Sequence, residues 1–498
     1  MLTYSFDDRG DNTLYEHLYK QIKNDIKNKE LKPGEKLPSK RALAKHLDIS
    51  TITVENAYNQ LAAEGYIYSV PRSGFYVSEI QVDDFDLNII DDTISLNAND
   101  QAPLTTNEQE LNSQSSNLSN ISDKYKEYID IEKRPDYFID LASNSTLIDN
   151  FPFSIWSKLM RETMSNNKEE LMTKSPSIGV YRLRAAIAKY LYEFRGMKVE
   201  PNQIVVGAGT EYLYGIIIKL LGHERVYGVE DPGYQKLSRI YQANKVKWVH
   251  IPLDSEGIDI SYLEESEVDV LHITPSHHFP TGIVTPITRR FELLSWASKS
   301  RKRYILEDDY DSEFRLIGKP IPSLQSIDTS EKVIYMNTFS KSLTSTIRIS
   351  YMVLPKSLME KYNKELSFYS CTVSNFEQYT LAKFIEEGFF EKHINRMRTY
   401  YKNIRNAILT SIRHKVSMNR VRIMEENSGL HFLLEVDTSL SDKEIVELAR
   451  EQGINISCLS QYYYDETHAK KHTLVINYSG LEEDKIDEGV ERLFKIFR

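Results

Sequence analysis

The stretch VIYMNTFSKSLTSTIRISY (residues 333–351) decides how the carboxyl-terminal part of this chain is interpreted. Its apolar start, Val333 to Met336, is rich in β-branched and aromatic residues and predicts a buried strand. Small hydroxyl residues follow, then Lys341 and, seven residues later, Arg348. A lysine just past a strand is more often solvent-exposed than functional, because lysine is rarely buried without a partner. The rest of the sequence has to decide between these two interpretations.

The chain has 498 residues, which is too long for one hydrophobic core and predicts two or more domains. No run of about 18 or more apolar residues occurs, so we expect no membrane span. The first residues, MLTYSFDDRG, lack the basic and apolar regions of a secretory signal. Cys371 and Cys458 are far apart and indicate neither a disulfide framework nor a cysteine metal site. These features favour a cytoplasmic protein without a bound metal.

Negative charge is concentrated in one segment of the chain. Residues 1–79 contain 11 basic and 11 acidic residues, whereas residues 80–135 contain four basic and 12 acidic residues. The second segment is rich in Asn, Ser and Gln and has no apolar periodicity, so it cannot bury enough surface to offset its ordering entropy. We predict a linker over 80–135 between a domain at 1–79 and a body at 136–498. The acidity of the chain therefore does not argue against DNA binding by the first domain.

The first domain has the pattern of three helices followed by a hairpin. LYEHLYKQIKNDI (14–26) repeats apolar residues every four positions, as one face of a helix does. KRALAKHL (40–47) predicts a short helix behind the N-cap Ser39, and TITVENAYNQLAAEGY (51–66) predicts another that Gly65 ends. The second of these presents hydroxyls and amides outward, which suits the major groove of DNA. YIYSVPRSGFYVS (66–78) predicts two strands around a basic tip. A small helical protein-interaction module would share several of these signals.

This order of elements resembles the GntR-type winged helix-turn-helix family, through LKPGEKLPSKRALAKHLDIS, TVENAYNQLAAEGYI and RSGFYV. Thr51 is a departure, because many family members have arginine there. A hydroxyl cannot make the bidentate guanine contact of an arginine, so the base preference stays open. The resemblance implies that the DNA contacts come from Ser39, Lys40 and Arg41 at phosphates or a base edge, Thr51, Thr53 and Asn56 at the groove, and Arg72 and Gly74 in the wing.

In the body, seven apolar runs alternate with helical patterns. This alternation predicts an α/β domain with a largely parallel sheet, whose functional residues lie at the carboxyl ends of the strands. The runs are NQIVVGAG, ERVYGVED, KWVHIPL, VDVLHITP, KRYILEDDYD, KVIYMNTFS and IRISYMVLP.

Polar groups follow five of these runs, and each has an ordinary explanation such as a turn or a helix cap. Together they suit one ligand, a pyridine aldehyde with a phosphate arm. Such a ligand needs an amine for an imine, a carboxylate for the ring nitrogen and a donor for the ring oxygen. It also needs a flat group for stacking, and N–H, hydroxyl and guanidinium groups for the phosphate. The sequence offers, in that order, Lys341, Asp308, Tyr310, Tyr234, the Gly209–Thr210 turn, Thr338 or Ser340, and Arg348.

The motifs EDPGY (230–234), TPSHHFPTG (274–282), EDDYDSEF (307–314) and TFSKSL (338–343) are similar to those of fold-type-I aminotransferases. The whole chain resembles the MocR-type regulators, in which a GntR-type head is joined to such a domain. The resemblance implies a homodimer, a large domain at about 150–385 and a small domain at about 386–498.

The same resemblance implies pyridoxal 5′-phosphate as the cofactor, held as an imine by Lys341, the candidate catalytic residue. It assigns Asp308 to the pyridine nitrogen and Tyr310 to the ring oxygen. His277 and His278 are implied to lie near the ring, and we list His278 as the candidate contact although the choice between them stays open. The remaining implied contacts are Tyr234 on the ring, and Gly209, Thr210, Thr338, Ser340 and Arg348 around the phosphate.

Departures from the family pattern concern the substrate. Lys236 stands two residues after Tyr234, where a relative that senses γ-aminobutyrate has arginine. Between Ser428 and Gly480, where aminotransferases have an arginine that clamps a substrate carboxylate, the sequence has only Arg450, on a predicted amphipathic helix. The strand-like INISCLSQYYYDE (454–466) offers Gln461 and tyrosines instead. Because bidentate carboxylate recognition is the task of arginine, a standard amino-acid substrate lacks its anchor.

We therefore predict a transcriptional regulator that binds double-stranded DNA. Its body is expected to sense pyridoxal 5′-phosphate, as in relatives that control vitamin B6 synthesis, or an amine that forms an imine with it. Three alternatives stay open. One is an active aminotransferase with an accessory DNA-binding head, and another is a sensor of an amino acid such as γ-aminobutyrate. The third is a vestigial body that serves only for dimerisation, in which Lys341 would be replaceable.

Overall fold

A computed structural model of the protein describes residues 2–6, 13–71, 73–78, 137–316, 322–416, 419–426 and 429–497. The chain separates into two compact units, residues 1–128 and 129–498. The predicted linker at 80–135 and the predicted DNA contact Arg72 lie outside the described residues.

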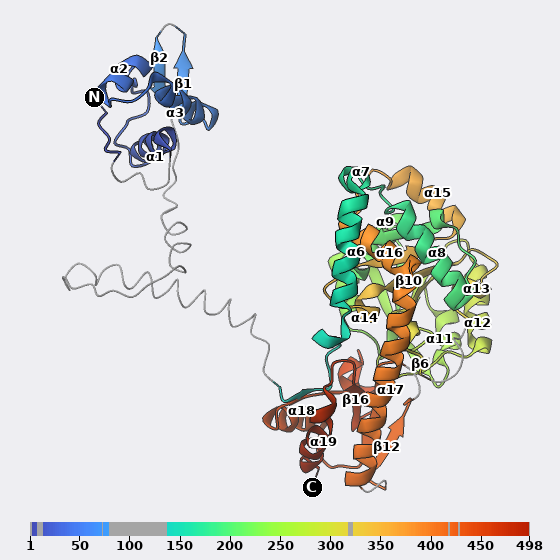
Figure 1. The fold of residues 1–498 in the computed structure, drawn as a ribbon. Coiled ribbons are helices and arrows are strands. Elements are labelled where there is room, and N and C mark those ends of the chain that lie inside the picture. The colour runs from blue at the N-terminus through green and yellow to red at the C-terminus, as the bar shows by residue number, and fades with distance from the viewer. Residues whose placement is uncertain are drawn as a thin grey trace. The chain divides into compact units, whose positions relative to one another are not determined.

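The amino-terminal unit contains the three helices and the hairpin expected from the sequence (Figure 1). Ser39 and Ser50 cap the second and third helices, because their side-chain oxygens accept hydrogen bonds from the N–H groups of Ala42 and Thr53 at 3.2 and 3.0 Å. Leu18, Ile22 and other apolar residues of all three helices form one buried core. The elements are α1 (Leu14–Lys27), α2 (Lys40–His46), α3 (Thr51–Ala63), β1 (Ile67–Val70) and β2 (Gly74–Val77).

An eight-stranded sheet forms the centre of the carboxyl-terminal unit, with the order β4-β11-β10-β9-β8-β5-β6-β7. The strands from β10 to β6 in this order run parallel, whereas β11 is antiparallel to both β10 and β4. All seven apolar runs of the sequence form strands of this sheet. The strands are β4 (Ile204–Gly207), β5 (Val226–Asp231), β6 (Lys247–Asp254), β7 (Gly257–Ile258), β8 (Val270–Ile273), β9 (Tyr304–Asp308), β10 (Val333–Thr338) and β11 (Ser350–Val353).

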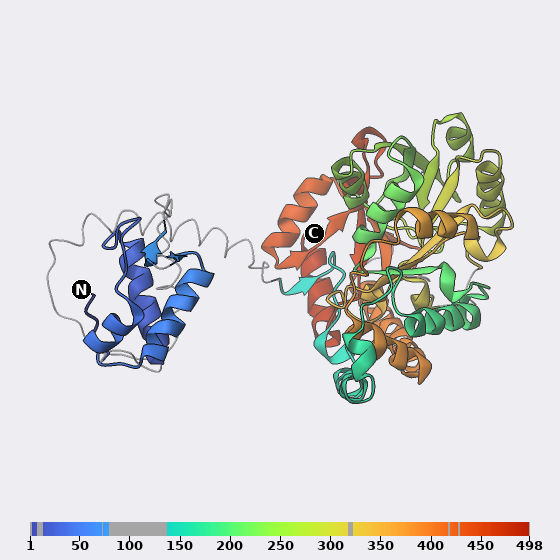
Figure 2. The same cartoon turned by 90° about the horizontal axis from the view of Figure 1, so that it is seen from above.

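Helices cover both faces of this sheet (Figure 2). Successive residues of a strand point to opposite faces, so Ile305 and Leu306 of β9 belong to two different buried clusters. One cluster includes residues of α9 and α15, and the other includes residues of α11 and α12. The helices of this domain are α6 (Phe153–Asn166), α7 (Lys168–Met172), α8 (Tyr181–Arg195), α9 (Thr210–Leu221), α10 (Lys236–Ala243), α11 (Ile260–Glu265), α12 (Ile287–Ser298), α13 (Leu324–Ile327), α14 (Phe339–Ser342), α15 (Lys356–Glu365) and α16 (Asn375–Glu386).

The long helix α17 (Phe389–Lys415) leads from the large domain into a small domain with a four-stranded sheet of order β12-β13-β16-β15 (Figure 1). The chain also enters the body here, because β3 (Ile139–Asp140) pairs in parallel with β14 (Ile454–Asn455) of the small domain. The other elements are β12 (Val421–Met424), β13 (His431–Val436), β15 (Ser457–Cys458), β16 (Thr473–Asn477), α18 (Asp442–Glu451) and α19 (Ile486–Lys495).

The strand-like run at 454–466 forms strands only at its start. After β15 the chain turns into a short 3₁₀ helix, Leu459–Tyr462, because the side chain of Gln461 accepts a hydrogen bond from the N–H of Cys458 at 2.9 Å. Across the described part of the chain, no helix is both long and apolar enough to cross a bilayer.

Candidate functional site

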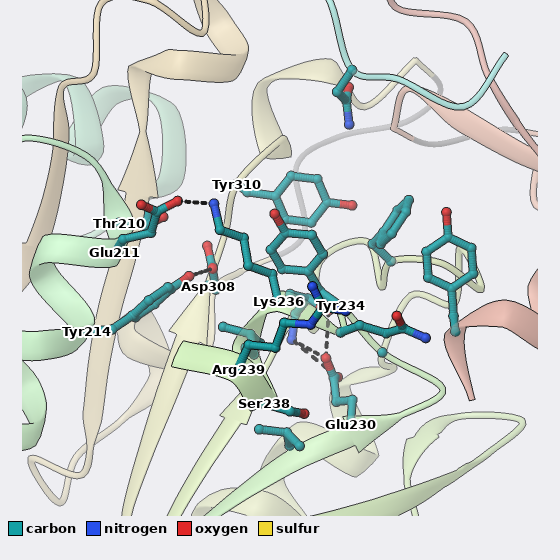
Figure 3. A pocket seen from close by; sticks show the side chains of 18 of the residues that line it. Thr210, Glu211, Tyr214, Glu230, Tyr234, Lys236, Ser238, Arg239, Asp308 and Tyr310 are labelled. Carbon is teal, nitrogen blue, oxygen red and sulfur yellow. Dashed lines mark hydrogen bonds and ion pairs between the residues drawn. The ribbon is translucent and has the colours of Figure 1, made fainter. Parts of the chain in front are cut away.

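A cavity of about 750 Å³ lies at the carboxyl ends of the parallel strands (Figure 3). Its floor comes from residues at the ends of β5, β8, β9 and β10, and its walls from the starts of α9 and α10. The segment Tyr462–Tyr464 of the small domain closes one side. A cavity of this size suits a small organic ligand.

Adjacent parallel strands bring Asp308 and Lys341 to this floor. Asp308 is the last residue of β9 and pairs in register with Met336 of β10. Lys341 follows five residues after Met336, on the short helix α14. The side chain of Thr338 caps α14, because its hydroxyl accepts a hydrogen bond from the N–H of Ser340 at 3.1 Å. A second hydrogen bond holds this cap, since the hydroxyl of Ser350 donates to the Thr338 hydroxyl at 2.8 Å.

Asp308 is buried and has one oxygen without a partner. Tyr214 donates to Oδ2 at 2.6 Å (Figure 3). Nε2 of His272 lies 3.7 Å from the same oxygen. The second oxygen, Oδ1, has no hydrogen-bond partner among the described residues. A buried carboxylate oxygen without a partner is costly, so this atom suits a cationic or N–H donor of a bound ligand.

The amine of Lys341 is available in the cavity. Among the described residues it forms no hydrogen bond or ion pair. Burial lowers the pKa of Lys341 to about 8, and the carboxylates of Asp311 and Asp308 only partly oppose this effect. A larger fraction of this amine is therefore neutral, and nucleophilic, than of an exposed lysine.

The start of α9 and Arg348 lie at the same end of the cavity and offer groups that suit an anion. Gly209 precedes the helix with φ of 90°, and an added Cβ there would lie 2.6 Å from Nη2 of Arg348. Only glycine leaves room for this close approach of the guanidinium. The free N–H groups at the start of a helix and an arginine together favour a phosphate. Thr210 and Ser340 also line the cavity here.

The aromatic side chains Tyr234 and Tyr310 face the cavity from two sides (Figure 3). Tyr234 is half exposed and follows β5, and the hydroxyl of Tyr310 donates to the carbonyl of His277 at 3.2 Å. His277 and His278 are both buried, and neither is among the residues that line the cavity. His278 instead hydrogen-bonds to Thr281 at 2.7 Å, and burial lowers its pKa to about 3.

The structure thus brings nine of the ten predicted cofactor contacts to one cavity and places His278 behind its wall. Whether these residues bind a cofactor stays a prediction. The nine are Lys341, Asp308, Tyr310, Tyr234, Gly209, Thr210, Thr338, Ser340 and Arg348.

Several residues that lie at the site were not predicted from the sequence. Tyr214 stands one helical turn after Thr210, but a buried tyrosine in an apolar helix is an ordinary core residue, so the sequence does not single it out. Glu230 lies at the end of β5, and burial raises its pKa to about 8. Arg239 lines the cavity from α10, but an arginine in an amphipathic helix gives no sequence signal for this role.

The predicted DNA contacts lie on α2, α3 and the hairpin. Ser39, Arg41, Thr51 and Asn56 are exposed, which leaves them accessible to a duplex. Lys40 forms an ion pair with Glu55 at 2.7 Å, and the hydroxyl of Thr53 hydrogen-bonds to that of Ser50 at 2.8 Å. Gly74 begins β2 with φ of 123°.

Comparisons with known proteins identify both units. The family model for bacterial regulatory proteins of the gntR family matches residues 14–77, and that for class I and II aminotransferases matches residues 137–493. The chain is 39% identical over 480 residues to the uncharacterized HTH-type transcriptional regulator YdeL of Bacillus subtilis, which is 96% of each chain. It is 28% identical to the probable rhizopine catabolism regulatory protein MocR of Rhizobium meliloti, over 98% of this chain and 94% of that one. The chain belongs to the MocR-type transcriptional regulators.

This regulator also has relatives with informative names. It is 29% identical to the pyridoxine biosynthesis transcriptional regulator PdxR of Corynebacterium glutamicum, over 90% of this chain and 88% of that one. Its body matches the structure of kynurenine aminotransferase from Pyrococcus horikoshii in complex with PMP. That match has a TM-score of 0.64 and 25% identity, and covers 75% of this chain and 94% of that one. The predicted GntR-type head and fold-type-I aminotransferase body are confirmed, and the body belongs to a fold family that binds pyridoxal phosphate.

Proposed function

We propose that the body of this regulator binds pyridoxal 5′-phosphate through Lys341, and that the cofactor, or an amine that reacts with it, controls DNA binding by the head. The observation that supports this proposal most directly is that Asp308 and Lys341 line the same cavity. The carboxylate offers an oxygen without a partner, and the lysine offers an amine of lowered pKa.

The residues of the cavity fit the cofactor at three points. The free Oδ1 of Asp308 suits the protonated ring nitrogen, because an ion pair in a buried site favours the charged form of the ring. The start of α9 with Arg348 suits the phosphate, and Tyr234 offers a ring face for stacking. When bound, the cofactor supplies an electrophilic aldehyde carbon and an electron-withdrawing ring.

The protein positions these groups by hydrogen bonds outside the ligand. Tyr214 donates to Asp308 and keeps its second oxygen directed to the cavity. Tyr241 hydrogen-bonds to Nδ1 of His272 at 2.8 Å and so fixes the ring that lies against the same carboxylate. These contacts orient the carboxylate before the ligand arrives, so that less ordering free energy is lost on binding.

We further propose that α2, α3 and the hairpin bind double-stranded DNA, with α3 in the major groove. The capped start of α3 exposes Thr51 and Asn56, and Ser39 and Arg41 lie exposed at the start of α2. Lys40 has to leave Glu55 to reach a phosphate, so its contribution to affinity is smaller than that of a free lysine. The closed symmetry common to such regulators would pair two heads on a two-fold operator, and we propose a homodimer.

A regulator is favoured over an aminotransferase by the missing substrate clamp. Within the described residues of the small domain, no arginine lines the cavity, and Arg450 lies exposed on α18. A working aminotransferase with an accessory head keeps the same cofactor chemistry and is the second candidate. The observation that favours it is a cavity lined by a lysine whose pKa is lowered to about 8.

A gel-shift titration tests the proposal. The DNA is a duplex selected from a random pool by the wild-type protein, and the cofactor is titrated against wild type, Lys341→Ala and Lys198→Ala. Lys198 is an exposed lysine outside the cavity and serves as the control. We expect a visible absorbance band and a cofactor-dependent change in DNA affinity or stoichiometry for wild type and the control, and neither for Lys341→Ala.

The outcomes separate the alternatives. If the cofactor changes neither affinity nor stoichiometry for wild type, sensing of the cofactor itself is wrong. Steady turnover of an amino donor and a keto acid by wild type would favour the aminotransferase. A Lys341→Ala protein that responds like wild type would show that the lysine is replaceable.

A further inference from the structure

Arg239 is a cation of the cavity wall that has no partner within the described structure. It lies on α10, five residues after Tyr234, and is labelled in Figure 3. Among the described residues it forms no hydrogen bond, ion pair or ring contact. The other two cations of the wall outside the lysine site differ, because both Lys236 and Arg348 contact Glu211. Arg239 is therefore the cation that a bound anion can pair with most readily.

Each acidic residue that lines the cavity either contacts another protein group or is largely protonated at neutral pH. Glu211 is held between Lys236 and Arg348, and Asp308 accepts from Tyr214. Glu230 accepts from the N–H and the hydroxyl of Thr274 at 3.1 and 2.8 Å, and its raised pKa leaves it largely protonated at neutral pH. None of these carboxylates forms an ion pair with Arg239 in the described structure.

Aromatic rings form the rest of this outer part of the cavity. The rings of Phe279 and Tyr462 meet edge to face at 5.1 Å, and those of His250 and Tyr464 stack at 4.0 Å. The backbone of this tyrosine segment is anchored, because Gly233 donates to the carbonyl of Tyr462 at 3.0 Å and the N–H of Tyr464 donates to Asp231 at 2.9 Å. An anchored aromatic wall favours a ligand with a flat apolar body.

We propose that the effector of this regulator is a primary amine that carries an anionic group, which Arg239 binds, and a flat apolar body that lies against the tyrosine segment 462–464. The amine end reaches the cofactor at Lys341, because Arg239 and Lys341 line one continuous cavity. This inference rests on the proposed function, since the amine is recognised through the bound cofactor. It assigns to α10 the anion recognition that the small domain does not supply.

Spectral titration of the cofactor-loaded, full-length protein tests the inference. The probes are para-(aminomethyl)benzoate, benzylamine, which lacks only the carboxylate, and γ-aminobutyrate, which lacks the ring. For wild type we expect para-(aminomethyl)benzoate to shift the visible band at the lowest concentration of the three. Arg239→Gln should weaken this response by about ten-fold or more while leaving that to benzylamine unchanged, because a charge-assisted hydrogen bond is lost.

Two variants sharpen the test. Arg239→Lys should retain only part of the preference, because lysine is a point charge and cannot bind a carboxylate with two parallel bonds. Arg301→Gln changes an exposed arginine between α12 and β9, outside the cavity, and should behave like wild type. The visible band of each variant, measured before titration, shows that its cavity is folded and loaded.

The inference and the proposed function fail in different ways. If wild type loads the cofactor but responds equally to benzylamine and its carboxylate, or if Arg239→Gln keeps the preference, anion recognition by Arg239 is wrong and the proposed function stands. If none of the amines shifts the band, the amine class is wrong. If wild type never acquires the band, the proposed function falls and this inference falls with it.

Discussion

At the scale of single residues, the chemistry of the cavity depends on the protonation of Lys341. Burial of an amine disfavours its charged form, and the pKa of Lys341 falls to about 8. Below this pH the amine is mostly protonated and cannot attack a carbonyl carbon. Above it the amine is neutral.

We therefore predict that the rate of cofactor capture rises with pH up to about 8 and levels off above it. In the lower range the increase should approach about ten-fold per pH unit, because the neutral fraction grows by that factor. Stopped-flow absorbance at constant ionic strength measures this rate. Unchanged capture rates between about pH 6 and pH 8 would contradict the lowered pKa.

The sequence identifies residues of the site where chemistry restricts the choice of side chain. Lys341, Asp308 and Arg348 each carry a charge at a strand end that a strand by itself does not need. Tyr214 and His272 escape notice because a tyrosine in a helix and a histidine in an apolar strand are ordinary core residues. Only the fold places them against Asp308. His278 was predicted as a contact but does not line the cavity. The sequence could not decide between His277 and His278, because the two are adjacent and have the same sequence context.

At the scale of elements, the start of α3 contributes to the stability of the head and also contains proposed DNA contacts. The side chain of Ser50 accepts a hydrogen bond from the N–H of Thr53 at 3.0 Å. Replacing such an N-cap by alanine costs about 1 kcal/mol, because an N–H group at the helix start loses its partner. The same change loosens the residues that we expect at the groove.

Ser50→Ala should therefore lower the free energy of opening of α3 by about 1 kcal/mol and weaken DNA binding. Hydrogen exchange of the α3 amides in the full-length protein measures the first effect, and a gel shift measures the second. Asn28→Ala, at an exposed residue that follows α1 and lies outside the proposed DNA-binding elements, is the control and should change neither. Equal exchange rates in Ser50→Ala and wild type would show that the cap is dispensable.

Strands that come from long apolar runs are predictable from the sequence, whereas strands of only two residues are not. The seven runs of the large sheet are apolar, bounded by turns and long enough to recognise. The strands β3 and β14 have only two residues each, and their pairing joins positions more than 300 residues apart in sequence. No local pattern encodes such a contact. The 3₁₀ helix at Leu459–Tyr462 likewise depends on one side-chain hydrogen bond.

At the scale of the whole molecule, the chain consists of two compact units with separate cores. We predict two transitions in scanning calorimetry of the full-length protein. A ligand that binds only the folded body stabilises that body in proportion to the logarithm of ligand concentration, and leaves the head unchanged.

Addition of pyridoxal 5′-phosphate should therefore raise the midpoint of one transition only, by an amount that increases with its concentration. Lys341→Ala should show a smaller increase at each concentration, because the covalent contribution to binding is lost. A single transition, or equal shifts of both, would contradict the independence of the two units.

The division into a head, an acidic segment and a body can be read from the sequence, because charge, composition and periodicity all change at the same positions. The two family models match residues 14–77 and 137–493, and the bounds of the division stay a prediction. The sequence did not indicate that the body begins on its small domain, because that attachment depends on the β3–β14 pairing.

This attachment has a mechanical consequence. In proteins built from two domains, binding of a ligand between the domains can move one domain relative to the other. The first strand of the body, β3, pairs with β14, so the described body begins on its small domain. If the small domain moved when a ligand binds, β3 would move with it, and the large domain would not have to transmit the change.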